Sequence, residues 1–166
     1  MQGINHISLC FLIKDDSVLL TMTSDRPGKT TLTGIVSHII GTDSITKKTV
    51  REVYRLTKVT VYEHDLKQSG TVHYYTINNS GNRIEVLKAT LYVCDVWQNN
   101  PVNATGIRPT WYAFGDIPFN LMLEDAQSWL PRVLEDDKII AEVYSRANTL
   151  SQDESVQEIL VRSILS

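Results

Sequence analysis

The residues best suited to chemistry lie in one basic stretch between Lys47 and Lys58. This stretch contains five lysines and arginines but one acidic residue, Glu52. Side chains three and four residues apart share a helix face, so Glu52, Arg55 and Leu56 would lie together on a helix. A magnesium site needs several hard oxygen ligands on such a face, whereas lysine and arginine bind phosphate directly by charge-assisted hydrogen bonds. The pattern therefore favours phosphate binding over metal binding.

A helix is predicted to position these side chains. Ser44 is a suitable N-cap residue. Apolar side chains recur near helical spacing from Ile45 to Leu56, which predicts a helix that ends at about Thr57.

Strand signals dominate the first hundred residues. The runs Ile7–Ile13 and Val18–Met22 flank a short polar turn and predict a hairpin. The β-rich runs Thr71–Ile77 and Ile84–Val96 flank an Asn- and Gly-containing turn and predict a second hairpin. Strands interleaved with helices in this order are typical of an α/β or α+β sandwich.

Two further helices are predicted towards the C-terminus. One covers Leu123–Leu134, and Pro131 inside it should end or kink it. The other covers residues 151–165, because Ser151 and Glu154 match a capping box. Its apolar stripe consists of Val156, Ile159, Leu160 and Ile164. We therefore expect a main domain over residues 1–145 and an amphipathic helical extension over 146–166. The apolar stripe is expected to pack on the same domain or, as the alternative, to bind a second copy or another protein through 151–165.

The composition excludes several classes of protein. A chain of 166 residues is long enough for one domain with a sizeable core. Its net charge of −3 does not indicate binding to nucleic acid or to membranes. No signal peptide or membrane span is recognisable, and Cys10 and Cys94 are interpreted as reduced core thiols, so a cytoplasmic location is expected.

Residues 33–61 resemble the Nudix box, the strand–loop–helix–loop motif of enzymes that cleave nucleoside diphosphates linked to another group. The family pattern is G-x5-E-x7-R-E-U-x-E-E-x-G-U, with U an aliphatic residue. Without gaps it falls on Ser37, Asp43, Arg51, Glu52, Val53, Arg55, Leu56, Lys58 and Val59. The arginine, the adjacent glutamate and both aliphatic residues are retained.

A second stretch resembles one branch of the same family, the MutT homologues that hydrolyse oxidised purine nucleoside triphosphates. Residues 107–134 share with this branch an Arg-Pro-x-Trp, an Ile-Pro-Phe, a Met and a Trp in the same order and spacing. The resemblance covers about residues 4–144. It implies a Nudix-type α/β (α+β) fold, in which a mixed β-sheet is sandwiched between helices.

The resemblance also implies that the metal site is degraded. Two magnesium-binding glutamates of the box are Arg55 and Leu56 here, and a further one, just before the Arg-Pro, is Gly106. Glu52 is the one retained catalytic glutamate and is insufficient alone. By analogy, Arg51 orients Glu52. We therefore expect no metal site, no cofactor and little or no hydrolysis.

Other positions suggest a ligand pocket. The branch reads its purine with an Asn, here Thr33, and a Trp-x-Asp-Asp run, in which Leu123 replaces the Trp and Asp125 is kept. His38 replaces a lysine, and Ser8 matches a small hydroxyl residue. The candidate ligand-binding residues are Ser8, Thr33, His38, Arg51, Arg55, His73, Tyr75, Leu123 and Asp125.

We therefore expect a Nudix-fold protein with a degenerate box that binds a nucleotide-like or other phosphorylated ligand, or a partner. Two alternatives stay open. One is a divergent MutT-type nucleoside triphosphate pyrophosphohydrolase that uses Mg²⁺ with Asp43, Glu52, Glu124 or Asp125. The other is a structural protein-interaction module.

Overall fold

The computed structural model describes residues 4–26, 29–147 and 154–164. Within these ranges the chain forms nine β-strands, two α-helices and three short 3-10 helices. The elements are β1 (Asn5–Lys14), β2 (Ser17–Arg26), β3 (Lys29–Thr33), β4 (Ile35–Ile39), α1 (Ile45–Thr57), η1 (Glu63–Asp65), β5 (Lys67–Ile77), β6 (Arg83–Cys94), β7 (Thr110–Ala113), η2 (Phe114–Asp116), η3 (Phe119–Leu121), α2 (Ala126–Leu134), β8 (Ile139–Ala147) and β9 (Glu154–Ser163).

The strands form one mixed sheet in the order β3-β2-β1-β6-β5-β8-β9, with β4 paired to β1 and β7 paired to β2. β1 pairs in parallel with β6 and antiparallel with β4, and β5 pairs in parallel with β8. Gly70 allows the close approach of β5 to β8, because its φ is +132° and a Cβ there would lie 1.8 Å from the Ile139 carbonyl oxygen. Both predicted hairpins are confirmed as β1–β2 and β5–β6.

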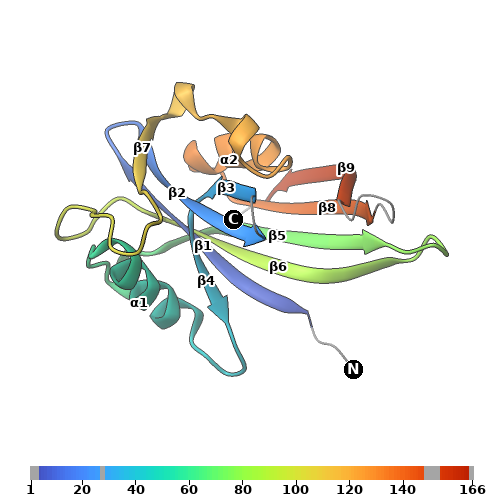
Figure 1. Cartoon of the computed structure of the whole chain (residues 1–166), viewed down its shortest axis with the longest axis horizontal. Helices are drawn as coiled ribbons and strands as arrows, with labels where there is room; N and C mark the ends of the chain where they lie inside the picture. The colour runs from blue at the N-terminus through green and yellow to red at the C-terminus, as the bar shows by residue number, and fades with distance from the viewer. Residues whose placement is uncertain (1–3, 27–28, 148–153, 165–166) are drawn as a thin grey trace.

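The two α-helices cover opposite faces of the sheet (Figure 1). Trp129 and Leu130 of α2 pack into the larger apolar core, and Val53 of α1 packs into the smaller one. This arrangement confirms the predicted mixed sheet between helices. Among the described residues, no helix is both long enough and apolar enough to span a membrane.

Helix α1 begins and ends where the sequence predicts. The Ser44 hydroxyl caps it by accepting a hydrogen bond from the Lys47 N–H. At the other end Lys58 adopts the left-handed conformation, with φ 64° and ψ 15°, and its N–H donates to the Tyr54 carbonyl. This is the position of the last glycine in the box pattern, and a glycine there would serve as an ordinary helix C-cap.

Helix α2 begins at Ala126, three residues later than predicted, because η3 and a turn occupy the preceding residues. Pro131 lies inside this helix, which nevertheless continues to Leu134. The helix therefore does not end at the proline but continues for three residues beyond it.

The predicted C-terminal helix is wrong. Residues Glu154–Ser163 form strand β9, which pairs antiparallel with β8, while Ser151 lies outside the described residues. The pairing shifts at Gln157, so a bulge separates Val156 from the regular part of the strand. Val156, Ile159 and Val161 all pack on the core, and the extra residue gives the first two a spacing of three. A spacing of three residues also occurs on one face of a helix, which explains why the sequence pattern predicted a helix here.

Candidate functional site

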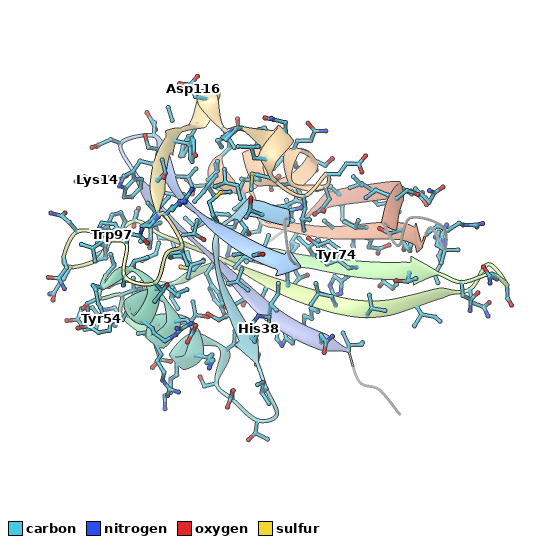
Figure 2. The ribbon with its side chains drawn as sticks, viewed as in Figure 1. Lys14, His38, Tyr54, Tyr74, Trp97 and Asp116 are labelled. Atoms are coloured by element: carbon cyan, nitrogen blue, oxygen red, sulfur yellow. The ribbon has the colours of Figure 1, made fainter. Side chains whose placement is uncertain are left out.

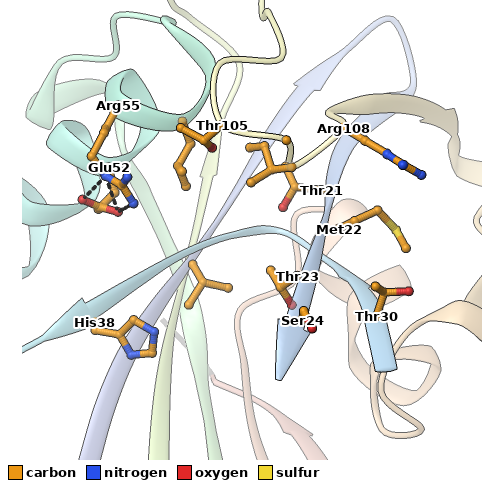
Figure 3. Close-up of a pocket in the computed structure, with 14 residues that line it drawn as sticks. Thr21, Met22, Thr23, Ser24, Thr30, His38, Glu52, Arg55, Thr105 and Arg108 are labelled. Atoms are coloured by element: carbon orange, nitrogen blue, oxygen red, sulfur yellow. Dashed lines mark hydrogen bonds and ion pairs between the residues drawn. The ribbon is translucent and has the colours of Figure 1, made fainter. Parts of the chain in front are cut away.

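Two adjacent pockets form one cleft between α1, β2, β4 and the loop before β7. The first has a volume of about 540 Å³, and we call it the arginine pocket. It is lined by Thr21, Met22, Thr23, Ser24, Thr30, Val36, His38, Glu52, Arg55, Leu56, Thr105, Gly106, Ile107 and Arg108. In Figure 3, Glu52 and Arg55 project from α1, while Thr21 to Ser24 come from β2 and His38 from β4.

The arginine pocket collects the four positions that the resemblance assigns to metal-binding glutamates. Glu52, Arg55, Leu56 and Gly106 all lie on its wall, although Gly106 is fifty residues or more from the other three. The first three share a face of α1 because of their helical spacing. The fold therefore gathers the expected positions, but one of the four carries a carboxylate.

That carboxylate is already paired. The Arg55 guanidinium donates from Nε and Nη2 to both carboxylate oxygens of Glu52, at 2.9 to 3.2 Å. These hydrogen bonds from Arg55 lower the pKa of Glu52. The analogy predicted that Arg51 orients Glu52, but the arginine that binds Glu52 is Arg55. Arg51 is exposed and lines neither pocket.

The lining residues do not fit Mg²⁺. This ion requires about six oxygen ligands in near-octahedral geometry, commonly one or two free carboxylates together with waters and substrate phosphates. The arginine pocket offers the carboxylate of Glu52, which is paired with Arg55, and neutral hydroxyls from Thr21, Thr23, Ser24, Thr30 and Thr105. Among the described residues, no three histidine, cysteine, aspartate or glutamate side chains are grouped to hold a metal ion.

The charge of the arginine pocket is instead suited to an anion. Arg108 lines it together with Arg55, so the lining contains two arginines and one glutamate. Arg108 was missed as a site residue, because the sequence drew attention to Arg108-Pro109 as a spacing motif and not as a source of charge. Its backbone has a φ of +50°, which belongs to the irregular loop before β7.

The second pocket, the aliphatic pocket, adjoins the first and has a volume of about 750 Å³. It is lined by Asn5, His6, Ile7, Leu9, Thr23, Ser24, Thr31, Thr33, Val36, His38, Ile39, Ile40, Tyr74, Leu87 and Leu123. Thr23, Ser24, Val36 and His38 belong to both pockets. Of the predicted ligand-binding residues, Thr33, His38 and Leu123 lie here, and His38 and Arg55 line the arginine pocket. Glu52, the predicted catalytic residue, also lines the arginine pocket.

The aliphatic pocket is lined by aliphatic and polar side chains in equal number, together with Tyr74. Burial, followed by the charge of Lys88, lowers the pKa of His6, which also bonds to the Thr90 hydroxyl at 2.8 Å. His38 and Tyr74 project from β4 and β5 (Figure 2). Ligand pockets in general combine apolar walls with polar groups that fix the ligand's orientation, and this lining provides both.

Asp125 is buried beside this pocket and does not line it. Its Oδ2 accepts a hydrogen bond of 2.8 Å from the Tyr74 hydroxyl and one of 2.7 Å from Trp129 Nε1. Burial, followed by the charge of Asp125, raises the pKa of Tyr74 well above its ordinary value. The structure therefore uses Asp125 to hold α2 against β5.

Ser8 is also engaged within the fold. Its hydroxyl lies 2.6 Å from the Thr49 hydroxyl of α1, and both residues are fully buried. Ser37 lies opposite Ser8 in the β1–β4 register and is buried as well. Its hydroxyl has no hydrogen-bond partner in the described part of the chain.

His73 and Tyr75 lie on the other face of the sheet. Tyr74, between them, faces the pocket, and side chains alternate along a strand. His73 bonds to Glu85 through Nδ1 at 2.7 Å, and Tyr75 stacks on Tyr144 with ring centroids 4.8 Å apart. Neither residue lines the cleft.

The other acidic candidates do not join Glu52. Asp43 accepts a hydrogen bond of 3.3 Å from the Ile40 N–H, so it stabilises the loop before α1. Glu124 is exposed and lines neither pocket. These acids are therefore not assembled into one site.

Comparisons with known proteins identify the fold. No protein-family model matches the chain, and no curated protein matches it significantly. A MutT protein from Bacillus halodurans superposes with a TM-score of 0.74 over 95% of this chain and 97% of that one, at 14% identity. A MutT NUDIX hydrolase from Burkholderia pseudomallei gives a TM-score of 0.59 over 81% of this chain and 98% of that one, also at 14% identity. An ADP-ribose pyrophosphatase from Streptococcus suis gives 0.56 over 81% and 92%, at 12% identity. The chain therefore has the Nudix fold.

Proposed function

We propose that this Nudix-fold protein binds a phosphorylated, nucleotide-like ligand in its cleft, with little or no magnesium-dependent hydrolysis. The observation that carries the proposal is the wall of the arginine pocket. Four positions that would hold metal carboxylates are together there, and three of them are Arg55, Leu56 and Gly106. A site with an arginine in place of a metal-binding acid is suited to bind a phosphate group directly. It is not suited to bind a metal cation that would bridge the protein and the phosphate.

The two pockets suit the two parts of such a ligand. The arginine pocket provides Arg55 and Arg108 for phosphate oxygens. The aliphatic pocket provides Leu87 and Leu123 for an apolar ring and the Thr33 hydroxyl for a polar edge. Structural neighbours include an ADP-ribose pyrophosphatase, so ADP-ribose and nucleoside triphosphates are the first ligands to examine.

Metal-free binding is the direct test. Isothermal calorimetry with ADP-ribose, ATP and inorganic pyrophosphate should detect binding in EDTA, and added salt should weaken it because the contacts are ionic. Arg55→Glu should weaken binding about tenfold or more, since one charged contact is commonly worth about 1.4 kcal/mol or more. Lys47→Glu is the matched control, because Lys47 is exposed on the same helix and lines neither pocket. Binding that requires magnesium, or that ignores Arg55, would rule the proposal out.

The metal site can be tested by restoring its acids. Wild-type protein should show no millimolar or tighter Mg²⁺ or Mn²⁺ site by calorimetry, and Arg55→Glu with Leu56→Glu should create one beside Glu52. The hydrolase alternative makes the opposite forecast for wild type. Robust magnesium-dependent pyrophosphate release from nucleoside triphosphates, abolished by Glu52→Gln, would establish that alternative.

A further inference from the structure

Strand β9 forms one edge of the described sheet. It pairs with β8, and no other described strand lies against it. Natural edge strands are usually protected by proline, lysine, bulges or a covering segment. The β9 sequence contains neither proline nor lysine, and its bulge at Gln157 leaves residues 158–163 regular.

The backbone groups that face the open edge can be assigned from the ladder. The Ile164 N–H donates to the Lys138 carbonyl, so this opposite pair is hydrogen-bonded. Hydrogen-bonded and non-bonded pairs alternate in an antiparallel ladder. Ser163, Val161 and Ile159 therefore direct their N–H and C=O groups away from β8. In agreement, the Val161 carbonyl accepts a bond of 3.3 Å from Arg132, which reaches it from α2.

The side chains of this edge have a self-complementary order. Glu158, Leu160 and Arg162 share the sheet face opposite α2, because Ile159 and Val161 between them pack on the α2-side core. Leu160 is 47% exposed on this face. The acid lies two residues before Leu160 and the base two residues after it.

We propose that two copies of this chain associate through β9, antiparallel, about a twofold axis at Leu160. In this register Leu160 of one copy lies opposite Leu160 of the other, and Glu158 of each copy lies opposite Arg162 of the other. On the α2 side, Ile159 of each copy lies opposite Val161 of the other. The pair 159–161 uses the outward backbone groups and is hydrogen-bonded. The pairs 158–162 and 160–160 are non-bonded, so their side chains approach most closely.

A twofold axis at another residue of β9 does not place both acid–base pairs opposite each other. A centre at Glu158 places this acid opposite itself and extends into the bulge at Gln157. A centre at Arg162 places two arginines opposite each other. Centres at Ile159 or Val161 place Glu158 opposite an aliphatic residue. The register at Leu160 is the one that joins both ion pairs and the leucine contact.

Two contacts within the chain are compatible with this pairing. Arg132 uses one lone pair of the Val161 carbonyl, and a carbonyl oxygen accepts two hydrogen bonds. Arg83 pairs with Glu158 at 3.2 Å on the surface, where a carboxylate can also accept a second arginine. Arg83 is therefore a competitor whose removal should not weaken the dimer.

The test uses charge reversal on the full chain. Sedimentation velocity and light scattering over a dilution series should show a dimer for wild type. Glu158→Arg and Arg162→Glu should each raise the dimer dissociation constant about tenfold or more, since both symmetric pairs become repulsive. An equal mixture of these two variants should regain the dimer, because every pair across the interface is again acid with base. Recovery in the mixture cannot arise if either variant had simply failed to fold.

Two controls complete the experiment. Lys47→Glu makes the same charge change as Arg162→Glu on a distant exposed helix and should leave the dimer unchanged. Arg83→Ala should leave it unchanged or tighten it. A wild-type chain that stays monomeric at all concentrations would overturn the proposal. So would a dimer that is insensitive to both reversals, or weakened variants that do not recover on mixing.

Discussion

Asp125 and Ser37 are two buried polar residues on opposite faces of the sheet, and their surroundings differ. Asp125, at the start of α2, accepts hydrogen bonds from Tyr74 and Trp129. Ser37, on β4 near α1, has a buried hydroxyl without a partner among the described residues. The resemblance marks Asp125 as retained and Ser37 as a replacement for glycine. The retained residue therefore has hydrogen-bond partners within the fold, whereas the neighbours of the replacement provide no partner for its hydroxyl among the described residues.

The strongest test of this contrast is Asp125→Ala. The change leaves the Tyr74 hydroxyl and the Trp129 indole N–H without their acceptor, and each buried unpaired donor costs about 1–3 kcal/mol. We therefore expect the free energy of unfolding to fall by about 2–5 kcal/mol in urea titrations. Asp116→Ala, an exposed control, should change it by less than about 0.5 kcal/mol. Equal effects of the two changes would contradict a structural role for Asp125.

Tyr74→Phe removes one of the two donors and should cost about 1–2 kcal/mol at neutral pH. The pH dependence is more specific. The pKa of Tyr74 is raised in the folded state, chiefly by burial, so the unfolded chain loses this proton first as pH rises. Wild-type stability should therefore fall above about pH 10, where an unfolded tyrosine ionises, and the variant should lack this component. The difference between the two proteins in urea titrations should narrow from pH 9 to 11; a constant difference would argue against the raised pKa.

The fold was predictable because its signals are local or come from the resemblance. The Ser44 cap, the helical spacing up to Thr57 and both hairpins appear in the structure as predicted. The C-terminal strand was not predictable from periodicity, because the bulge at Gln157 shifts the faces of the strand. A strand with one extra residue presents Val156 and Ile159 on one face, as a helix would.

The site was predictable in its positions and less so in its contacts. The box alignment brought Glu52, Arg55 and Leu56 to one wall, where the structure also places Gly106. It did not predict that Glu52 pairs with Arg55, because the partner of a side chain depends on its rotamer and not on its place in a motif. Nor did it exclude His73, since the face on which a strand residue points depends on register.

Ser37→Ala tests the other half of the contrast. An unpaired buried hydroxyl costs free energy, so its removal should leave stability unchanged or raise it by about 1 kcal/mol. Ser8→Ala is the matched control, because the Ser8 hydroxyl is bonded to Thr49 at 2.6 Å and its loss should destabilise by about 1 kcal/mol. Thermal unfolding of both variants measures the difference. Destabilisation by Ser37→Ala as large as that of Ser8→Ala would mean that the Ser37 hydroxyl is satisfied.

Lys58 extends the comparison to a second glycine position of the box. It holds a left-handed conformation at the C-cap of α1, which costs a side-chain-bearing residue about 1 kcal/mol relative to glycine. Lys58 also lies over the Tyr54 ring, 5.2 Å from its centroid, and at an exposed site such a contact returns about 0.5 kcal/mol. Lys58→Gly should therefore raise the free energy of unfolding by about 0.5 kcal/mol, the smallest effect forecast for this protein.

Lys58→Ala separates the two contributions, because alanine keeps the backbone strain and loses the ring contact. It should lower the free energy of unfolding by about 0.5 kcal/mol, so the two variants should differ by about 1 kcal/mol in parallel urea titrations. Replicate titrations can resolve that difference even though each separate change is small. If glycine proves no more stable than alanine, Lys58 is not strained, and this replacement in the box has been accommodated where that of Ser37 has not.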